Sequence, residues 1–286
     1  MRLTNRIWSW GAAVRDFGRK VGLPGPIQSA MLRLAPKLVP PPTSETVATL
    51  ENGLALRVPP RYPSARTYAI GKYEPEVTDL VRTTLSQGDI FVDVGANVGY
   101  FTLVASTLVG ETGHIFSFEP EATSFEFLMR NLRDNKCRNV TAENMAVADR
   151  ERPLTKSSEA AGPETTFSSA DLGAAGVVEG ISLDSYFSKK GWPKIRLIKI
   201  DVEGWENHVL AGMAELCRRN PRLSVILEFN EAALRLQGTS RMQLCSTLRI
   251  LGFDRAFVIE RNRRVIDLGK GLPGTGATYN LLLERR

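Results

Sequence analysis

From residue 88 onward, short apolar segments alternate with longer segments of helical spacing. Such alternation indicates βαβ units, in which helices cover both faces of a mostly parallel sheet. The predicted strands are residues 90–94, 114–118, 139–143, 195–200 and 223–228. The predicted helices are about residues 99–108, 123–135, 204–218 and 240–251. This order of elements places the chain in the α/β class.

The segments that flank this region carry weaker signals. A strand is predicted within residues 53–60 and a helix over residues 74–85, and the tail reads as two more strands joined by a Gly/Pro-rich loop, "FVIERNRRVID" and "TYNLLLERR". Residues 150–180 are rich in Ser, Ala, Gly and Glu, which predicts a long irregular insertion. Three consecutive prolines end at residue 42 and mark a boundary. We therefore expect an N-terminal arm, residues 1–42, and one domain, residues 43–286.

The arm carries the excess positive charge of the chain. Residues 1–42 hold seven basic residues and one acid, and removing these from the chain's 37 basic and 31 acidic residues leaves 30 of each. A neutral body argues against nucleic acid as a partner. Apolar residues recur in the arm at alternating spacings of four and three: Leu3, Ile7, Trp10, Val14, Phe17 and Val21. This pattern predicts an amphipathic helix. Residues 1–22 would then contact an anionic membrane surface, a second subunit or the protein's own domain.

Cysteine usage and hydropathy indicate the compartment. The three cysteines are widely spaced and form no CxxC pair, which supports neither a disulfide framework nor a zinc knuckle. No apolar run reaches the ~20 residues of a membrane span, and charged residues interrupt the N-terminal apolar stretch too early for a signal peptide. We expect a cytoplasmic protein, with peripheral membrane contact through the arm as an alternative.

The segment "DIFVDVGANVGYF", residues 89–101, predicts a strand, a glycine turn and a helix N-terminus, which together can hold a ligand against the backbone. A dinucleotide fits poorly, because the turn lacks the middle glycine of G-x-G-x-x-G and Asp93 would repel a pyrophosphate. The carboxylate of Asp93 suits a cationic ligand instead. S-adenosylmethionine is such a ligand, since it carries an ammonium and a sulfonium. A tight turn without any ligand is the alternative.

The next two predicted strands also end in polar residues. Glu119 lies 26 residues after Asp93, and a carboxylate at that position can accept hydrogen bonds from both ribose hydroxyls. Asn144 follows the third predicted strand and could reach an adenine edge. The order of acid, glycine turn and acid at successive strand ends supports a nucleoside-containing cofactor.

Six segments carry a family resemblance: "VDVGANVGYFTLVAS", "FSFEP", "NMAVAD", "ISLDSYF", "LIKIDVEGWE" and "VILEFN". They follow one another as in the FkbM-type methyltransferases, and residues 50–283 resemble that family. The resemblance implies a Rossmann-like class I methyltransferase that uses S-adenosylmethionine and usually methylates a hydroxyl of a sugar or natural product. It also implies the cofactor residues: Asp93, Gly95, Ala96, Asn97 and Gly99 in the turn, Glu119 at the ribose, and Asn144 with Ala146 beside the adenine.

Carboxylates are the candidates for chemistry. Asp201 and Glu203 follow one predicted strand and Glu228 ends another, so they meet if those strands are neighbours. One of them would take the proton of an acceptor hydroxyl. Lys199 shares a strand face with Asp201 and would hold that acid ionised or point into the sheet edge. Neither of the two histidines, at 114 and 208, has a catalytic setting. We predict no metal site, although a divalent cation held by the carboxylates is an alternative.

The predicted function is O-methylation of a small-molecule, sugar, glycolipid or natural-product acceptor with S-adenosylmethionine. Methylation of a peptide or amine nitrogen is the alternative within the enzymes. A module that binds S-adenosylmethionine without catalysis is a second alternative, and an oxidoreductase is a third. Tyr73, Glu74 and Trp205 would border the acceptor pocket or belong to the core.

Overall fold

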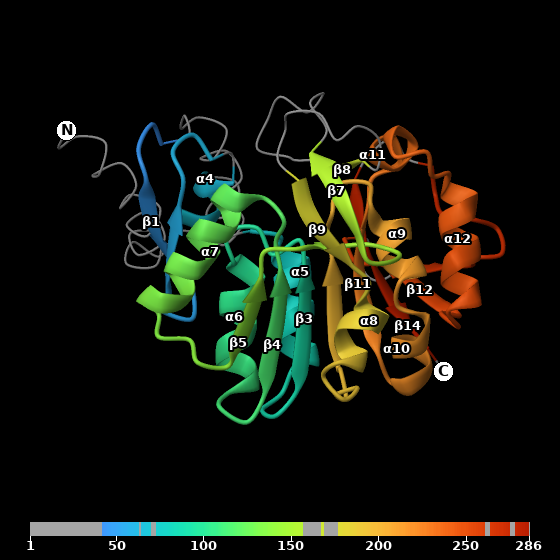
Figure 1. The fold of residues 1–286 in the computed structure, drawn as a ribbon, viewed down its shortest axis with the longest axis horizontal. Helices are drawn as coiled ribbons and strands as arrows, with labels where there is room; N and C mark the ends of the chain where they lie inside the picture. Colours follow the sequence, from blue (N-terminus) through green and yellow to red (C-terminus); the bar gives the residue numbers. More distant parts are fainter. Residues whose placement is uncertain are drawn as a thin grey trace, which may run out of the picture.

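The computed structural model describes residues 42–62, 64–69, 73–156, 167–168, 177–260, 264–274 and 278–285 (Figure 1). Its centre is an eight-stranded sheet. In spatial order the strands are β13 (Arg264–Ile266), β12 (Arg255–Val258), β14 (Tyr279–Glu284), β11 (Ser224–Phe229), β10 (Leu197–Ile200), β3 (Ile90–Val94), β4 (His114–Phe118) and β5 (Val140–Glu143). The five predicted strands are therefore confirmed, with small shifts at their ends.

The strand order reverses between β3 and β10. From β3 the chain adds β4 and then β5 on one side, and later returns to add β10 and β11 on the other, all parallel. β14 is antiparallel and lies between β11 and β12. In open sheets of this kind, ligands bind at the carboxyl ends of the strands where the order reverses. The topology thus places a site at the ends of β3 and β10.

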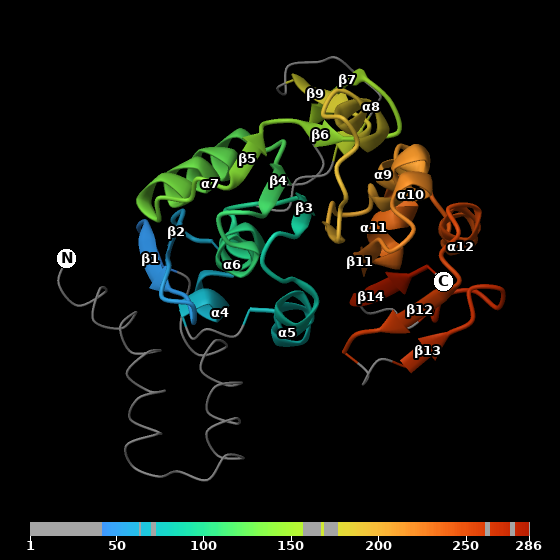
Figure 2. The same ribbon diagram turned by 90° about the horizontal axis from the view of Figure 1, so that it is seen from below.

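Two hydrophobic cores lie on opposite faces of the sheet. On β3, Phe91 belongs to one core and Val92 to the other, as expected for alternating side chains. The core with Phe91 is covered by α5 (Pro75–Thr84), α6 (Tyr100–Val109) and α7 (Ala122–Asp134). The core with Val92 is covered by α8 (Leu183–Ser188), α9 (Glu206–Ala211), α10 (Ala214–Arg219) and α12 (Arg241–Ile250). Figure 2 shows α5 and α6 on one side of the sheet and α9, α10 and α12 on the other.

Local signals explain where the helices begin. α5 starts with a proline, α7 is capped by Glu121, whose side chain accepts a hydrogen bond from Ser124 N, and α12 carries a capping box made by Ser240 and Gln243. The predicted helices over 74–85, 99–108, 123–135 and 240–251 are confirmed.

The prediction of a single helix over residues 204–218 is wrong. The segment forms α9 and α10, and the break falls at Gly212. A Cβ atom on Gly212 would overlap the carbonyl oxygen of Ala148, so the chain passes too close to a neighbouring backbone to continue as one helix. The carboxylate of Asp184, from the "ISLDSYF" segment, accepts hydrogen bonds from Glu215 N at 2.9 Å and Leu216 N at 2.7 Å and so caps α10.

The prediction that residues 150–180 form a wholly irregular insertion is also wrong. A second sheet contains β6 (Ala146–Val147), β9 (Val177–Ile181), β7 (Arg152–Lys156) and β8 (Phe167–Ser168), in that order. β7 and β9 pair as antiparallel strands, and Leu154 on β7 is buried in the core that contains Val92. The tail likewise holds three strands where two were predicted, since its first segment folds into β12 and β13. A short helix, α11 (Glu231–Leu236), was not predicted.

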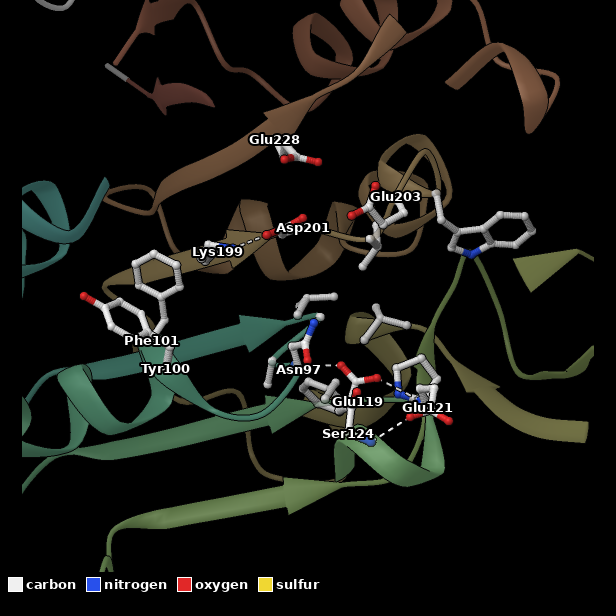
Figure 3. A pocket seen from close by; sticks show the side chains of 18 of the residues that line it. Asn97, Tyr100, Phe101, Glu119, Glu121, Ser124, Lys199, Asp201, Glu203 and Glu228 are labelled. Carbon is white, nitrogen blue, oxygen red and sulfur yellow. Dashed lines mark hydrogen bonds and ion pairs between the residues drawn. The ribbon is translucent and has the colours of Figure 1, made fainter. Parts of the chain in front are cut away.

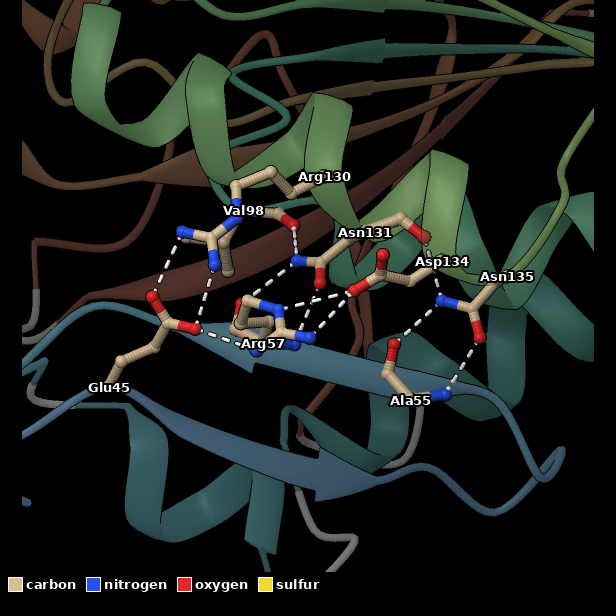
Figure 4. A network of polar contacts seen from close by, with 8 residues as sticks. All are labelled: Glu45, Ala55, Arg57, Val98, Arg130, Asn131, Asp134 and Asn135. Atoms are coloured by element: carbon tan, nitrogen blue, oxygen red, sulfur yellow. Dashed lines mark hydrogen bonds and ion pairs between the residues drawn. The ribbon is translucent and has the colours of Figure 1, made fainter.

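A polar network fastens the N-terminal hairpin to α7 (Figure 4). β1 (Thr46–Thr49) and β2 (Ala55–Val58) pair as antiparallel strands, and α4 (Ala65–Ala69) follows them. Asn131 accepts from Arg57 N at 2.7 Å and donates to Arg57 O at 2.9 Å and Val98 O at 2.8 Å. Asn135 exchanges two hydrogen bonds with Ala55 in the same way. Because Val98 belongs to the glycine turn after β3, α7 ties the hairpin to the turn.

The predicted amphipathic arm lies outside the described residues, except for Pro42. Its contact with a membrane, a second subunit or the domain therefore stays a prediction. Among the helices that the structure places, none combines the length and the apolarity that crossing a bilayer requires.

Candidate functional site

A pocket of about 350 Å³ opens at the carboxyl ends of β3, β4, β10 and β11 (Figure 3). This volume lies within the ~300–1,000 Å³ of small-molecule sites. The predicted site residues that line it are Gly95, Ala96, Asn97, Glu119, Ala146, Lys199, Asp201, Glu203 and Glu228. Tyr73, Glu74 and Trp205 line it as well. Asp93, Gly99 and Asn144 do not.

The turn after β3 is packed backbone against backbone. Gly95 has φ +82°, and a Cβ atom there would overlap the carbonyl oxygen of Asp201 at the end of β10. Only glycine can adopt this positive φ and also leave room for the carbonyl oxygen without strain. The N–H groups of Gly95 and Ala96 both donate to Phe118 O at 3.0 Å. The turn therefore joins the ends of β3, β4 and β10 into one rigid floor of the pocket.

Glu119, at the end of β4, is fixed by this turn. Its side chain is 6% exposed and accepts hydrogen bonds from Asn97 N at 2.7 Å and Glu121 N at 2.8 Å. Burial raises the pKa of its carboxyl group to about 7. Asn144 donates to Glu119 O at 2.8 Å and so holds the main chain beside this acid rather than facing the pocket.

Asp93 lies beneath the pocket rather than in it. It is 1% exposed, and one carboxyl oxygen accepts from Thr102 Oγ1 at 2.6 Å, while the other has no hydrogen-bond partner. Asp93 does not line the pocket, and its predicted contact with the ammonium of the cofactor stays a prediction. Its register partner on β10 is Lys199, which gives Asp93 the role of a buried counter-charge. Gly99 caps α6 and faces Leu128 of α7.

Three carboxyl groups meet on the other side of the pocket. Asp201, Glu203 and Glu228 each place an oxygen within 4.8 Å of the others, as neighbouring parallel strands predict. Burial and the carboxylates of Asp201 and Glu203 raise the pKa of Glu228 well above its usual range. Oxygens this close can exchange a proton through one bridging water or hold a cation, and Lys199 already supplies one positive charge.

Lys199 is a buried ammonium on the central strand. It is 2% exposed, donates to Asp201 Oδ2 at 2.6 Å and lies 4.6 Å from the centre of the Phe101 ring. Burial alone would lower its pKa, but the carboxylates of Asp201, Glu74 and Asp93 raise the pKa above its ordinary value. The lysine thus stays charged and orients one oxygen of Asp201.

Sequence reasoning named Tyr73 as a possible border of the pocket but missed the aromatic wall to which it belongs. Tyr68 packs against Tyr73 with ring centres 4.5 Å apart and against Tyr100 at 5.3 Å, and Tyr62 and Phe101 extend the cluster. All five residues line the pocket. The signal that could have found them is the run of tyrosines at 62, 68 and 73 directly before the helix α5.

Comparisons with known proteins point to one family. The sequence profile described as "Methyltransferase FkbM domain" matches residues 93–254. The hexuronic acid methyltransferase AglP of Haloferax volcanii is 26% identical over 150 residues, which cover 49% of this chain and 56% of that protein. The protein-L-isoaspartate O-methyltransferase of Methanosarcina mazei is 39% identical over 57 residues, 20% of this chain and 24% of that protein. The chain thus matches only about half or less of each relative's length.

Solved structures of methyltransferases also align with this chain, at low scores. A precorrin-6y C5,15-methyltransferase from Geobacter metallireducens aligns with a TM-score of 0.42 and 15% identity, covering 75% of this chain and 89% of that one. A SAM-dependent methyltransferase from Aquifex aeolicus aligns with a TM-score of 0.39 and 14% identity, covering 73% and 88%. At these scores the alignments add nothing to the strand order described above.

Proposed function

This chain belongs to the FkbM methyltransferase family, and on that premise we propose that it methylates a hydroxyl oxygen of a sugar-containing acceptor. Its fold is the Rossmann-like fold of class I methyltransferases. Its methyl donor is S-adenosylmethionine, which supplies an electrophilic methyl group when bound. The acceptor and the methylated atom are the parts that we propose.

The pocket residues fit this cofactor. Glu119 ends β4 where a ribose would lie and could accept hydrogen bonds from its two hydroxyls. Asn97 Oδ1 is buried without a hydrogen-bond partner, and a bound donor group would satisfy it. Apolar surface for a purine ring comes from Met145, Ala146 and Val147. These residues, with the backbone of the glycine turn, would hold the cofactor.

The convergence of Asp201, Glu203 and Glu228 carries the proposal of O-methylation. An alcohol must lose its proton as the new carbon–oxygen bond forms, and a carboxylate within hydrogen-bond reach can accept it. Lys199 holds Asp201 Oδ2, so the second oxygen of Asp201 is the one available to the acceptor. The relative named as a hexuronic acid methyltransferase supports a sugar as the acceptor.

The test is methyl transfer from methyl-labelled S-adenosylmethionine to a panel of methyl glycosides, small amines and peptides, with the product located by mass spectrometry. We expect a methyl ether on a glycoside. Methylated nitrogen with unmodified glycosides would contradict the proposal. Cofactor binding without transfer to any member of a broad panel would favour a binding module.

Cofactor binding is expected to depend on pH through Glu119. The ionised carboxylate accepts from both ribose hydroxyls, whereas the protonated form accepts less well, and burial raises its pKa to about 7. Affinity for S-adenosylmethionine should therefore increase about tenfold between about pH 6 and pH 8, because about nine-tenths of the acid is protonated at the lower value. Isothermal titration calorimetry at each pH measures this affinity.

The matched variants are Glu119→Gln and Glu126→Gln. Glu126 is exposed on α7, so its variant should keep the pH dependence. Glu119→Gln should bind weakly at every pH. A slope that persists in Glu119→Gln would assign the dependence to another group.

A further inference from the structure

The residues that line the pocket are strongly acidic. They include one ammonium, Lys199, and six carboxyl groups: Glu74, Glu119, Glu121, Asp201, Glu203 and Glu228. Burial raises the pKa of Glu74, Glu119 and Glu228, so these three can carry protons. Even without their charges, the remaining three carboxylates outnumber the single ammonium. S-adenosylmethionine carries a net charge of about +1 near neutral pH, since its ammonium and sulfonium outweigh its carboxylate. Among the described lining residues, carboxylates therefore outnumber positive charges even when the charge of the cofactor is added.

None of the described residues that line the pocket offers a free cation. Lys199 is the only basic residue among them, and its ammonium is bonded to Asp201 at 2.6 Å and packed on Phe101. A carboxylate on the acceptor would find no counter-charge among these described residues, and it would lie near Asp201 and Glu228. Like charges at such short range in a partly buried site repel strongly.

The polar residues divide into two groups at opposite sides of the pocket (Figure 3). Asn97, Glu119, Glu121 and Ser124 gather at the β4–α7 side, where the cofactor's nucleoside would lie. Asp201, Glu203 and Glu228 gather at the β10–β11 side. The acceptor must approach the second group, because that group holds the proposed base.

Glu74 belongs to this acceptor side. Its carboxyl group interacts electrostatically with Lys199 and Asp201 and shares a hydrogen bond with Tyr73. The other oxygen, Oε2, is buried and has no hydrogen-bond partner. The residue also has φ +39° directly before Pro75, where an extended conformation is preferred. A strained backbone and an unsatisfied buried oxygen together are typical of a functional position.

Trp205 supplies a second unsatisfied group. It lines the pocket, is 6% exposed, and its indole Nε1 has no hydrogen-bond partner. Trp205 needs an acceptor atom and Glu74 needs a donor. A sugar with hydroxyl and amino groups carries both kinds of group.

We propose that the acceptor is a sugar that carries a protonated amine, that Glu74 binds this amine, and that sugars with a carboxylate are rejected. This inference rests on the proposed function. It would set this chain apart from the relative named for hexuronic acid. A protonated amine has no lone pair, so pairing it with Glu74 also protects the nitrogen and leaves a hydroxyl oxygen as the site of methylation.

The test is binding of methyl glucosides matched at carbon 6, in the presence of S-adenosylhomocysteine. The series contains methyl glucoside, methyl 6-amino-6-deoxyglucoside and methyl glucuronide, with methyl glucosaminide placing the amine at carbon 2. We expect affinity to decrease from amino sugar to neutral sugar to uronate, with a difference of at least about tenfold between the first and the last. Glu74→Gln should remove most of the preference for an amine, while Glu76→Gln, exposed on the same helix, should keep it.

Methyl transfer to the same glycosides separates the two proposals. Equal or tighter binding of the glucuronide, or a preference unchanged in Glu74→Gln, overturns the inference. If a hydroxyl is still methylated in that case, the proposed function stands alone. Absence of both binding and transfer for every glycoside overturns both proposals.

Discussion

Replacing Asp201 by asparagine is expected to lower kcat about 10²–10⁴-fold, the usual contribution of a positioned base. The amide cannot take the proton of the acceptor hydroxyl. Affinity for S-adenosylmethionine should stay within about threefold of the parent, since Glu119, which is proposed to hold the ribose, lies across the pocket from Asp201. Steady-state kinetics of glycoside methylation measures kcat, and calorimetry measures the affinity for S-adenosylmethionine.

Two controls are needed to interpret a loss of turnover in Asp201→Asn. The substitution leaves Lys199 without its carboxylate partner, so thermal unfolding must show that the variant is folded at the assay temperature. Asp79→Asn, on the exposed face of α5, should leave kcat unchanged. Equal turnover in Asp201→Asn and the parent would end the assignment.

The same assay addresses the alternative of a bound divalent cation. If Asp201 acts as a base next to the ammonium of Lys199, a chelator should not change the rate. Activity that a chelator abolishes and magnesium restores would instead assign Asp201, Glu203 and Glu228 to a cation.

The sheet and the convergence of the acids could be predicted because both follow from local patterns. Short apolar segments such as residues 90–94 are strands that helices cover on both sides, and parallel strands end at one edge. Asp201 and Glu228 therefore had to meet once β10 and β11 were neighbours. Lys199 sits two residues before Asp201, and the two-residue period of a strand puts both on one face.

The errors have a common cause, which is contact between segments far apart in the chain. The break between α9 and α10 depends on how closely Gly212 passes Ala148, and β7 pairs with β9 across a long loop. The burial of Asp93 also depends on its surroundings, because Thr102 and Lys199 reach it from α6 and β10. No periodicity within one segment reports such contacts.

Gly95→Ala is expected to destabilise the protein by roughly 2–5 kcal/mol and to abolish measurable cofactor binding. Two costs add at this position. The first is the left-handed conformation, φ +82°, which disfavours any side chain. The second is overlap between the new Cβ and the carbonyl oxygen of Asp201, at the end of β10, which has no room to move because Asp201 N donates to Val94 O at 3.0 Å.

Gly53→Ala separates these two costs. Gly53 has φ +83°, nearly the same conformation, but nothing lies within 4 Å of an added Cβ. Its variant should lose only the conformational part, about 1–2 kcal/mol, and should bind S-adenosylmethionine like the parent. Chemical denaturation and calorimetry on both variants measure the difference. Because the overlap at Gly95 falls on the residue proposed as the base, a Gly95 variant that still binds the cofactor should nevertheless show a reduced kcat. Equal stability losses in the two variants would mean that the turn and the end of β10 are not in contact, and the rigid floor that holds cofactor and base together would have to be abandoned.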